Sequence, residues 1–133
     1  MGAVIEDDNE RILLVKHRPE RGGFWQGKWI CPGGELEPGE TIGQGIKREV
    51  KEETQLDIEL LAPLTPFERI ARENGEVALH VIYIDYLARR TGGELKPGSD
   101  VGEAQWIEKQ RLPGITDELH EDTVKLLRLA GII

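Results

Sequence analysis

The sequence lacks a second cysteine, a long apolar run and an excess of basic residues. Because Cys31 is the only cysteine, no disulfide can form within the chain, and a reducing compartment fits. Residues 1–8 carry neither a basic segment nor a long apolar run, so we expect no secretion signal, no membrane span and a cytoplasmic protein. The 25 acidic residues against 17 basic ones give a net charge of −8, which argues against a surface for a nucleic acid duplex or an anionic membrane.

No internal repeat, linker or low-complexity segment interrupts the 133 residues, which predicts one domain, 1–133, with a single core. Apolar patterning predicts a strand hairpin from segments 3–5 and 11–16, further extended segments at 57–64, 76–88 and 104–107, and helices at 42–54 and 118–129. Strands on both sides of a helix, followed by a closing helix, indicate the α/β class with a mixed sheet covered on both faces.

The start of the first predicted helix carries a recognisable signal. Thr41 is a good N-cap residue, and Gln44 three positions later completes a capping-box pattern. Gly43 and Gly45 are unusual there, because a glycine inside a helix costs about 1 kcal/mol relative to alanine. Close packing of the preceding loop against the first turn explains such glycines.

The same helix places its acidic residues unusually. At about 100° per residue, with Ile42 at zero, Glu53 falls at about 20°, Glu49 at about 340° and Glu52 at about 280°. The three carboxylates therefore lie beside, and partly within, the apolar stripe. An ordinary surface helix keeps its acids away from that stripe and mixes them with basic residues.

A divalent cation accounts for this arrangement. Like charges at i,i+3 and i,i+4 cost about 0.2–0.5 kcal/mol each on an exposed helix, and desolvation near a core adds to that cost. Hard ions such as Mg²⁺ prefer oxygen ligands and remove both penalties. The alternative is a solvated acidic face with Arg48 and Glu52 as an i,i+4 ion pair, and the helix alone does not decide between the two.

A glycine turn, Pro32-Gly33-Gly34, precedes the helix. Glycines let the backbone approach a ligand closely, so a carbonyl of this turn can supply a further oxygen ligand. The alternative is a simple turn, for which a glycine pair on its own is common.

Taken together, residues 34–56 resemble the Nudix box: a glycine, five residues, a glutamate, seven residues, then Arg-Glu, an aliphatic, any residue, Glu-Glu, any residue, glycine and an aliphatic. The matching positions are Gly34, Glu40, Arg48, Glu49, Val50, Glu52, Glu53 and Leu56. The departure is Gln55 in place of the closing glycine, which is expected in the left-handed conformation. Glutamine there predicts a cost of about 1 kcal/mol, or a different helix end, rather than a loss of chemistry.

The resemblance implies an α/β/α sandwich with the box as a loop–helix–loop, and a hydrolase that cuts a diphosphate linkage in a nucleoside diphosphate derivative. It implies that Glu52 and Glu53 ligate Mg²⁺, or Mn²⁺ in its place, with help from Glu49 and the Gly33 carbonyl. These same residues are the expected catalytic centre.

The resemblance also implies supporting roles within the box. Arg48 is expected to orient the carboxylates by ion pairing, while Gly34 and Glu40 support the loop and the helix. Metal-bound water requires a proton acceptor, for which the three helix carboxylates are candidates. Glu103, in the loop before Trp106, is a further catalytic candidate, and Asp100 is a weaker one.

Substrate-binding residues are expected in the loop ahead of the box. Arg18 and Arg21 suit a phosphate, and Trp25 suits a nucleobase, although Trp25 is equally a packing residue. His17, His80 and His120 show no metal spacing and are expected to be structural or exposed.

The expected substrate is a small nucleotide. Short relatives with this build favour a nucleoside triphosphate, oxidised ones included, that yields a monophosphate and pyrophosphate. ADP-ribose and dinucleoside polyphosphates are the rivals, whose hydrolases tend to carry a proline or tyrosine where this chain has residues 71–73, Ala-Arg-Glu. The alternative of another class is a non-catalytic nucleotide-binding module. A plain Ca²⁺-binding protein is a third interpretation, but the acidic residues of this chain lack the loop spacing of a calcium hand. Whether the chain forms a homodimer is left open.

Overall fold

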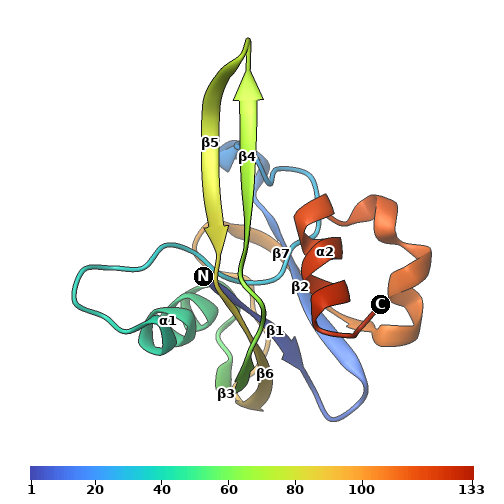
Figure 1. The fold of residues 1–133 in the computed structure, drawn as a ribbon. Coiled ribbons are helices and arrows are strands. Elements are labelled where there is room, and N and C mark those ends of the chain that lie inside the picture. The colour runs from blue at the N-terminus through green and yellow to red at the C-terminus, as the bar shows by residue number, and fades with distance from the viewer.

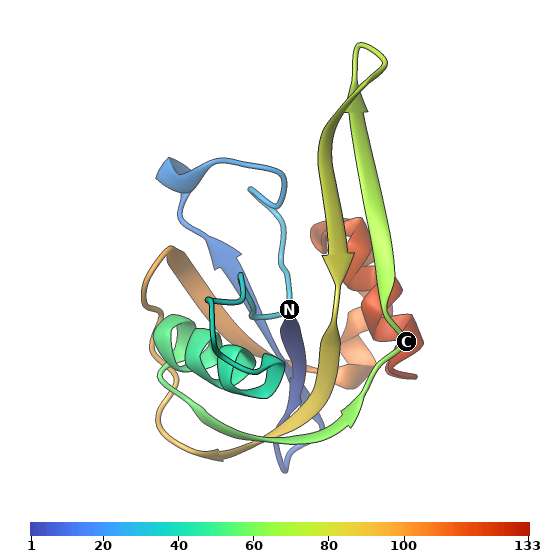
Figure 2. The ribbon, with the colours of Figure 1, turned by 60° about the vertical axis from the view of Figure 1, so that its left-hand side comes forward.

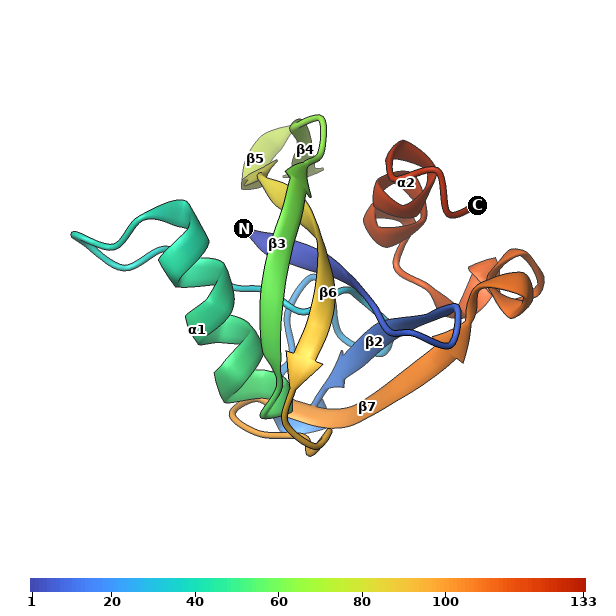
Figure 3. The same ribbon diagram turned by 90° about the horizontal axis from the view of Figure 1, so that it is seen from below.

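The computed structural model describes residues 1–133 and shows a five-stranded mixed sheet between two helices (Figure 1). The sheet has the order β3-β6-β1-β2-β7, with β1 and β6 parallel and the other neighbours antiparallel. Its strands are β1 Gly2–Glu6, β2 Arg11–His17, β3 Asp57–Pro63, β6 Asp85–Gly92 and β7 Val101–Glu108. Helix α1, Ile42–Thr54, covers one face and α2, Glu121–Leu129, the other (Figure 3). The predicted sandwich is confirmed.

The core is divided by the sheet because successive side chains of a strand point to opposite faces. In β2, Leu13 packs toward α1, whereas Ile12 and Leu14 pack toward α2, and all three are fully buried. The α1 side is completed by Ala3, Ile5, Ile46, Val50, Leu56, Ile58 and Ala88. The α2 side is completed by Val4, Trp29, Ile107, Leu112, Leu119, Leu126 and Leu127. The register of β2 therefore decides which side of the sheet a polar side chain reaches.

A separate two-stranded ribbon, β4 Phe67–Glu73 and β5 Glu76–Tyr83, projects from the sandwich (Figure 2). The single strand predicted at 76–88 is wrong, because the chain leaves the ribbon after Tyr83 and Asp85 begins β6 in the main sheet. The alternation of apolar and polar residues continues through both strands. A strand pattern therefore does not show where the pairing partner changes.

Helix α1 begins and ends as its sequence predicts. Thr41 accepts a hydrogen bond from the Gln44 amide, and the Gln44 side chain accepts one from the Thr41 amide, which confirms the capping box. The helix ends at Gln55, whose φ of 65° is left-handed and whose amide donates to the Lys51 carbonyl. Glutamine thus adopts the conformation that a closing glycine adopts without strain.

Between β7 and α2 the chain forms short turns before the second helix begins. Short 3-10 turns occupy Lys109–Gly114 and Thr116–Glu118, so α2 starts at Glu121 rather than at the predicted residue 118. A further 3-10 turn, Pro19–Arg21, follows β2. Neither α1 nor α2 has the length and apolar content that a membrane-crossing helix needs.

Candidate metal and active site

The buried carboxylate of Glu53 lies where α1 meets the glycine turn. Glu53 is only 2% exposed, and its Oε1 accepts a hydrogen bond from the Gly33 amide at 2.9 Å. That amide is the one hydrogen-bond donor to the Glu53 side chain, and no positively charged side chain forms an ion pair with it. The Gly33 carbonyl accepts no backbone hydrogen bond, so it is free to bind a ligand. The glycine turn is thus joined to the helix through Glu53, and the Gly33 carbonyl keeps its capacity to accept.

Arg48 donates hydrogen bonds to the other acidic residues of the box. Its Nη2 and Nε donate to the two carboxylate oxygens of Glu40 at 2.7 and 3.0 Å. Its Nη1 donates to Glu49 at 2.8 Å and to Glu52 at 3.3 Å, and Nη2 also reaches the Glu35 carbonyl at 2.9 Å. A guanidinium offers five donors in one plane, so a single side chain ties the loop to two helix carboxylates. The side-chain pKa of Glu40 is lowered by its hydrogen bond from Arg48.

Two glycines of this region are required by close packing. A Cβ on Gly34 would overlap the Glu49 carboxylate, with Oε1 only 2.6 Å away. A Cβ on Gly45 would lie 2.9 Å from both Glu40 Oε1 and the Leu36 side chain. The expectation that the preceding loop packs against the first helical turn is therefore confirmed at Gly45. At Gly43 the nearest contact is an ordinary 3.4 Å, and no close packing explains it.

Burial makes two of the helix carboxylates, Glu53 and Glu49, resist ionisation. Loss of hydration raises the pKa of Glu53 to about 8, the Gly33 amide opposes this, and the nearby Glu49 and Asp100 charges raise it further. Burial also raises the pKa of Glu49, against the lowering effect of Arg48. A group of acids held close together in a low-dielectric setting needs a counter-charge before all can ionise.

Beyond the box, β2 and the segment before β7 bring two more potential ligands to Glu53. One oxygen each of Glu53 and Asp100 and one ring nitrogen of His17 all lie within 4.8 Å of one another. His17 is the last residue of β2 and is 7% exposed. Burial lowers the pKa of His17, as does the charge of Arg21, while Asp100 opposes the change. Sequence spacing gave His17 no part in a metal site, and only the fold shows this proximity.

The Arg21 side chain and the Arg18 backbone contact Asp100 of this cluster, and Glu103 lies apart from it. Arg21 forms an ion pair with Asp100, and the Arg18 amide donates to the Asp100 carbonyl at 2.8 Å. Glu103 pairs with Lys16 in the β2–β7 ladder, on the α2 side of the sheet, where its side chain is 59% exposed. Since α1 covers the opposite face, Asp100 and not Glu103 lies beside the helix carboxylates.

Trp25 contacts the ribbon and, through it, α2, and it forms no hydrogen bond with the carboxylate cluster. Its indole Nε1 donates to the Tyr83 hydroxyl at 3.0 Å, and the Tyr83 hydroxyl donates to Asp122 at 2.6 Å. Neighbouring Phe24 packs edge-on against His120. The loop ahead of the box therefore runs from the carboxylate cluster, at Arg21, to the ribbon and α2, at Trp25.

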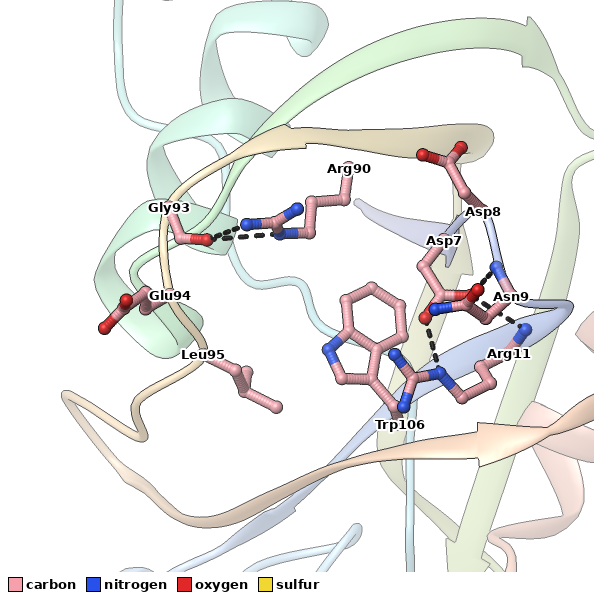
Figure 4. A pocket seen from close by; sticks show the side chains of 9 residues that line it. All are labelled: Asp7, Asp8, Asn9, Arg11, Arg90, Gly93, Glu94, Leu95 and Trp106. Atoms are coloured by element: carbon pink, nitrogen blue, oxygen red, sulfur yellow. Dashed lines mark hydrogen bonds and ion pairs between the residues drawn. The ribbon is translucent and has the colours of Figure 1, made fainter.

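A hollow of about 270 Å³ lies at the other end of the sheet (Figure 4). It is lined by the turn between β1 and β2, by Arg90 and Leu95, and by Trp106, over which the Arg11 guanidinium lies. Arg11 and His17 stand at opposite ends of β2, six residues or about 20 Å apart. This hollow is thus remote from the Nudix-type carboxylates and takes no part in the site.

The donors gathered at Glu53 fit a divalent cation. Three carboxylates of α1 lie within about 1.1 turns of helix, and the Gly33 carbonyl accepts no backbone hydrogen bond. Oxygen donors of this kind suit Mg²⁺ and Mn²⁺, and Mg²⁺ in proteins takes one or two carboxylates with substrate phosphates and water. A bound cation would supply the counter-charge that Glu53 lacks.

Comparison with known proteins gives the same assignment. The NUDIX domain family model matches residues 1–129. The ADP-ribose pyrophosphatase of Methanocaldococcus jannaschii is 35% identical over 92% of this chain and 68% of its own length, and the nucleoside triphosphatase NudI of Escherichia coli is 28% identical over 98% and 94%. The crystal structure of a MutT NUDIX hydrolase from Burkholderia pseudomallei superposes with a TM-score of 0.78 and 28% identity over 96% of this chain and 93% of that one. The chain belongs to the Nudix hydrolase family and is a pyrophosphohydrolase.

Proposed function

We propose that this enzyme hydrolyses a nucleoside triphosphate, oxidised forms included, to a monophosphate and pyrophosphate with the help of a divalent cation. The observation that carries the cation-dependent part is Glu53. It is an acid buried to 2% exposure, with one amide donor, no cationic partner and a pKa raised to about 8. A cation beside such a group favours its charged, carboxylate form.

Glu49, Glu52, Glu53 and the Gly33 carbonyl hold the cation in this proposal, with Mg²⁺ as the resident ion and Mn²⁺ as its substitute. When bound, the ion neutralises phosphate oxygens and lowers the pKa of a water molecule. Arg48 fixes the direction of the Glu49 and Glu52 carboxylates through its hydrogen bonds. Glu40 holds the other side of the Arg48 guanidinium, and Gly34 leaves room for the Glu49 carboxylate.

The proton of the attacking water needs an acceptor, and Glu52 is our choice for the state in which Glu49, Glu53 and the Gly33 carbonyl hold the cation without it. Its side chain is 48% exposed, and its single contact with Arg48 is the longest of the Arg48 hydrogen bonds to a carboxylate. Glu49 and Glu53 are more buried and more firmly held. A general base has to be free to turn toward the reacting water, and Glu52 meets this condition best of the three helix carboxylates.

The substrate's phosphates meet Arg18 and Arg21 in this proposal, and its base lies toward Trp25. Arg21 already reaches the carboxylate cluster through Asp100, and Arg18 follows His17 directly at the end of β2. Guanidinium groups bind phosphate oxygens in a bidentate way, and an indole ring offers a stacking face to a base.

Two substrate classes compete. The near end-to-end match with the E. coli nucleoside triphosphatase, and the Ala-Arg-Glu sequence at residues 71–73, favour a triphosphate. The higher identity with the archaeal ADP-ribose pyrophosphatase favours ADP-ribose as the second candidate. Both reactions break a diphosphate linkage, so the cation site serves either.

A screen of the purified protein with Mg²⁺ distinguishes these candidates. Nucleoside triphosphates, oxidised nucleotides, ADP-ribose and dinucleoside polyphosphates are incubated separately, and the released products are identified by chromatography. Pyrophosphate with a nucleoside monophosphate supports the proposal. AMP with ribose 5-phosphate establishes the second candidate, and no turnover of any compound establishes the non-catalytic nucleotide-binding module. Cytoplasmic residence and a homodimer stay predictions, tested by fractionation and by analytical ultracentrifugation.

A further inference from the structure

His17 stands out among the polar side chains near Glu53. It lies 93% buried, at 7% exposure, and its ring atom Nδ1 is enclosed without any hydrogen-bond partner. No hydrogen bond or ion pair of either ring nitrogen is found in the structure. A buried imidazole normally finds a partner, because an unmatched polar atom loses the hydration that it has in water. The missing partner therefore points to a ligand that the chain itself does not supply.

The fold directs His17 into the carboxylate cluster. Leu13, four residues earlier in β2, packs toward α1, and the alternation of the strand places His17 on the same face. The β2–β7 ladder shifts register between Lys16 and His17, so that His17 pairs with Val101, directly after Asp100. Bulges of this kind re-aim side chains and are common next to active sites.

The spacing of the three side chains suits one cation. A ring nitrogen of His17 and carboxylate oxygens of Glu53 and Asp100 lie within 4.8 Å of one another. Ligands about 2.1 Å from an octahedral ion are about 3.0 Å apart when adjacent and about 4.2 Å apart when opposite. Small side-chain rotations therefore close the three donors around an ion. Arg21 contacts only Oδ2 of Asp100, which leaves Oδ1 available.

We propose that His17 supplies a nitrogen ligand, together with Glu53 and Asp100, to a divalent transition-metal ion at this site. The inference rests on the proposed cation-dependent function and adds a donor from outside the Nudix box. Imidazole nitrogen binds ions such as Mn²⁺, Co²⁺ and Zn²⁺ better than it binds Mg²⁺, because affinity for nitrogen donors rises along the transition series and Mg²⁺ prefers oxygen. The chain is thus expected to bind Mn²⁺ more tightly than Mg²⁺.

The test uses Mn²⁺ alone, without nucleotide. Pulsed electron paramagnetic resonance of the wild-type protein with Mn²⁺ should show coupling to one imidazole nitrogen, and His17→Phe should abolish it. Calorimetry should show the Mn²⁺ dissociation constant rising about tenfold or more in His17→Phe. The Mg²⁺ constant should change by less than about threefold. His80→Gln, which replaces an exposed histidine on the ribbon, is the matched control and should leave both constants and the nitrogen signal unchanged.

The outcomes separate the two proposals. Mn²⁺ that binds with no nitrogen coupling in the wild-type protein overturns the role of His17 and leaves the carboxylate site intact. Failure of both Mn²⁺ and Mg²⁺ to bind overturns the proposed function and this inference together. The wild-type spectrum needs no variant, so the test stands even where His17→Phe folds poorly. Asp100→Asn, which keeps the size of the side chain, should also weaken Mn²⁺ binding while the nitrogen signal persists.

Discussion

The two least exposed carboxylates of this protein lie in different surroundings. Asp122, 3% exposed at the start of α2, accepts hydrogen bonds from Arg69 Nε at 2.9 Å and from the Tyr83 hydroxyl at 2.6 Å. Glu53, 2% exposed in α1, accepts one hydrogen bond from the Gly33 amide. Asp122 thus has its counter-ion and a further donor within the chain, whereas Glu53 has neither.

The difference indicates what each side of the sheet is for. The α2 side carries a satisfied polar network that ties the ribbon to the sandwich, and its value lies in stability. The α1 side keeps acids together at a cost in stability, which is typical of a site that a ligand completes. Four experiments test this difference between the two sides of the sheet.

The largest effect is expected at Glu53. Glu53→Gln keeps the size of the side chain and the hydrogen bond from the Gly33 amide but removes a charged cation ligand. Turnover should fall by about tenfold or more, while the circular dichroism spectrum is unchanged. Steady-state kinetics at saturating Mg²⁺ measures this. Wild-type turnover in Glu53→Gln would remove the metal role assigned to this residue.

The matching change on the other side is Asp122→Asn. It leaves Arg69 without its buried counter-ion and should cost about 2 kcal/mol of unfolding free energy. For a chain of this size that lowers the melting temperature by roughly 6 °C. The Mg²⁺ dissociation constant should stay as in the wild type, since Asp122 belongs to α2, which lies across the sheet from α1 (Figure 3). A weakened Mg²⁺ affinity in Asp122→Asn would break the contrast between the two sides.

The pH dependence of stability sharpens the contrast at Glu53. Its pKa in the folded protein, about 8, lies above the ordinary value of 4.5, so the folded state binds the proton more tightly than the unfolded state does. Stability from this group is therefore full below about pH 4.5 and is lost as the pH rises through about 8. Without metal, Glu53→Gln should melt roughly 5 °C above the wild type at pH 8.5 and level with it at pH 4.5. Equal melting temperatures at both pH values in the presence of a chelator would show that Glu53 is not strained.

The smallest effect is expected at the end of α1. Gln55 holds a φ of 65°, which costs about 1 kcal/mol for a residue with a Cβ. Gln55→Gly should therefore raise the melting temperature by about 3 °C and leave turnover unchanged. Gln55→Ala is the control and should bring no gain, because alanine keeps the strain. A gain of equal size in Gln55→Ala would assign the effect to the side chain and not to the backbone.

Local signals predicted much of the fold. The Thr41–Gln44 capping box and the apolar period of α1 are properties of neighbouring residues, so the sequence carries them. The left-handed position of Gln55 was likewise predicted from its place in the box. The break between β5 and β6 was missed, because it is a change of pairing partner within a continuous alternation. The strand β4 was missed because four of its seven residues are charged.

The candidate site was predicted where it is local and missed where it is not. Glu49, Glu52 and Glu53 lie on one helix, so their spacing reveals them. His17 and Asp100 come from distant segments, and only the register of β2 against β7 places them beside Glu53. The same register carries Glu103 to the opposite face, which no inspection of the loop sequence reveals.

The central claim is that the acids of α1 hold a cation that in turn holds a polyphosphate. The most direct measurement is a crystal structure with Mn²⁺ and a non-hydrolysable nucleoside triphosphate, in which anomalous scattering locates the ion. We predict an ion within about 2.5 Å of a Glu53 oxygen and of a phosphate oxygen. A bound nucleotide with no ion at Glu53, and with the Glu52 side chain directed into bulk water, would contradict the account.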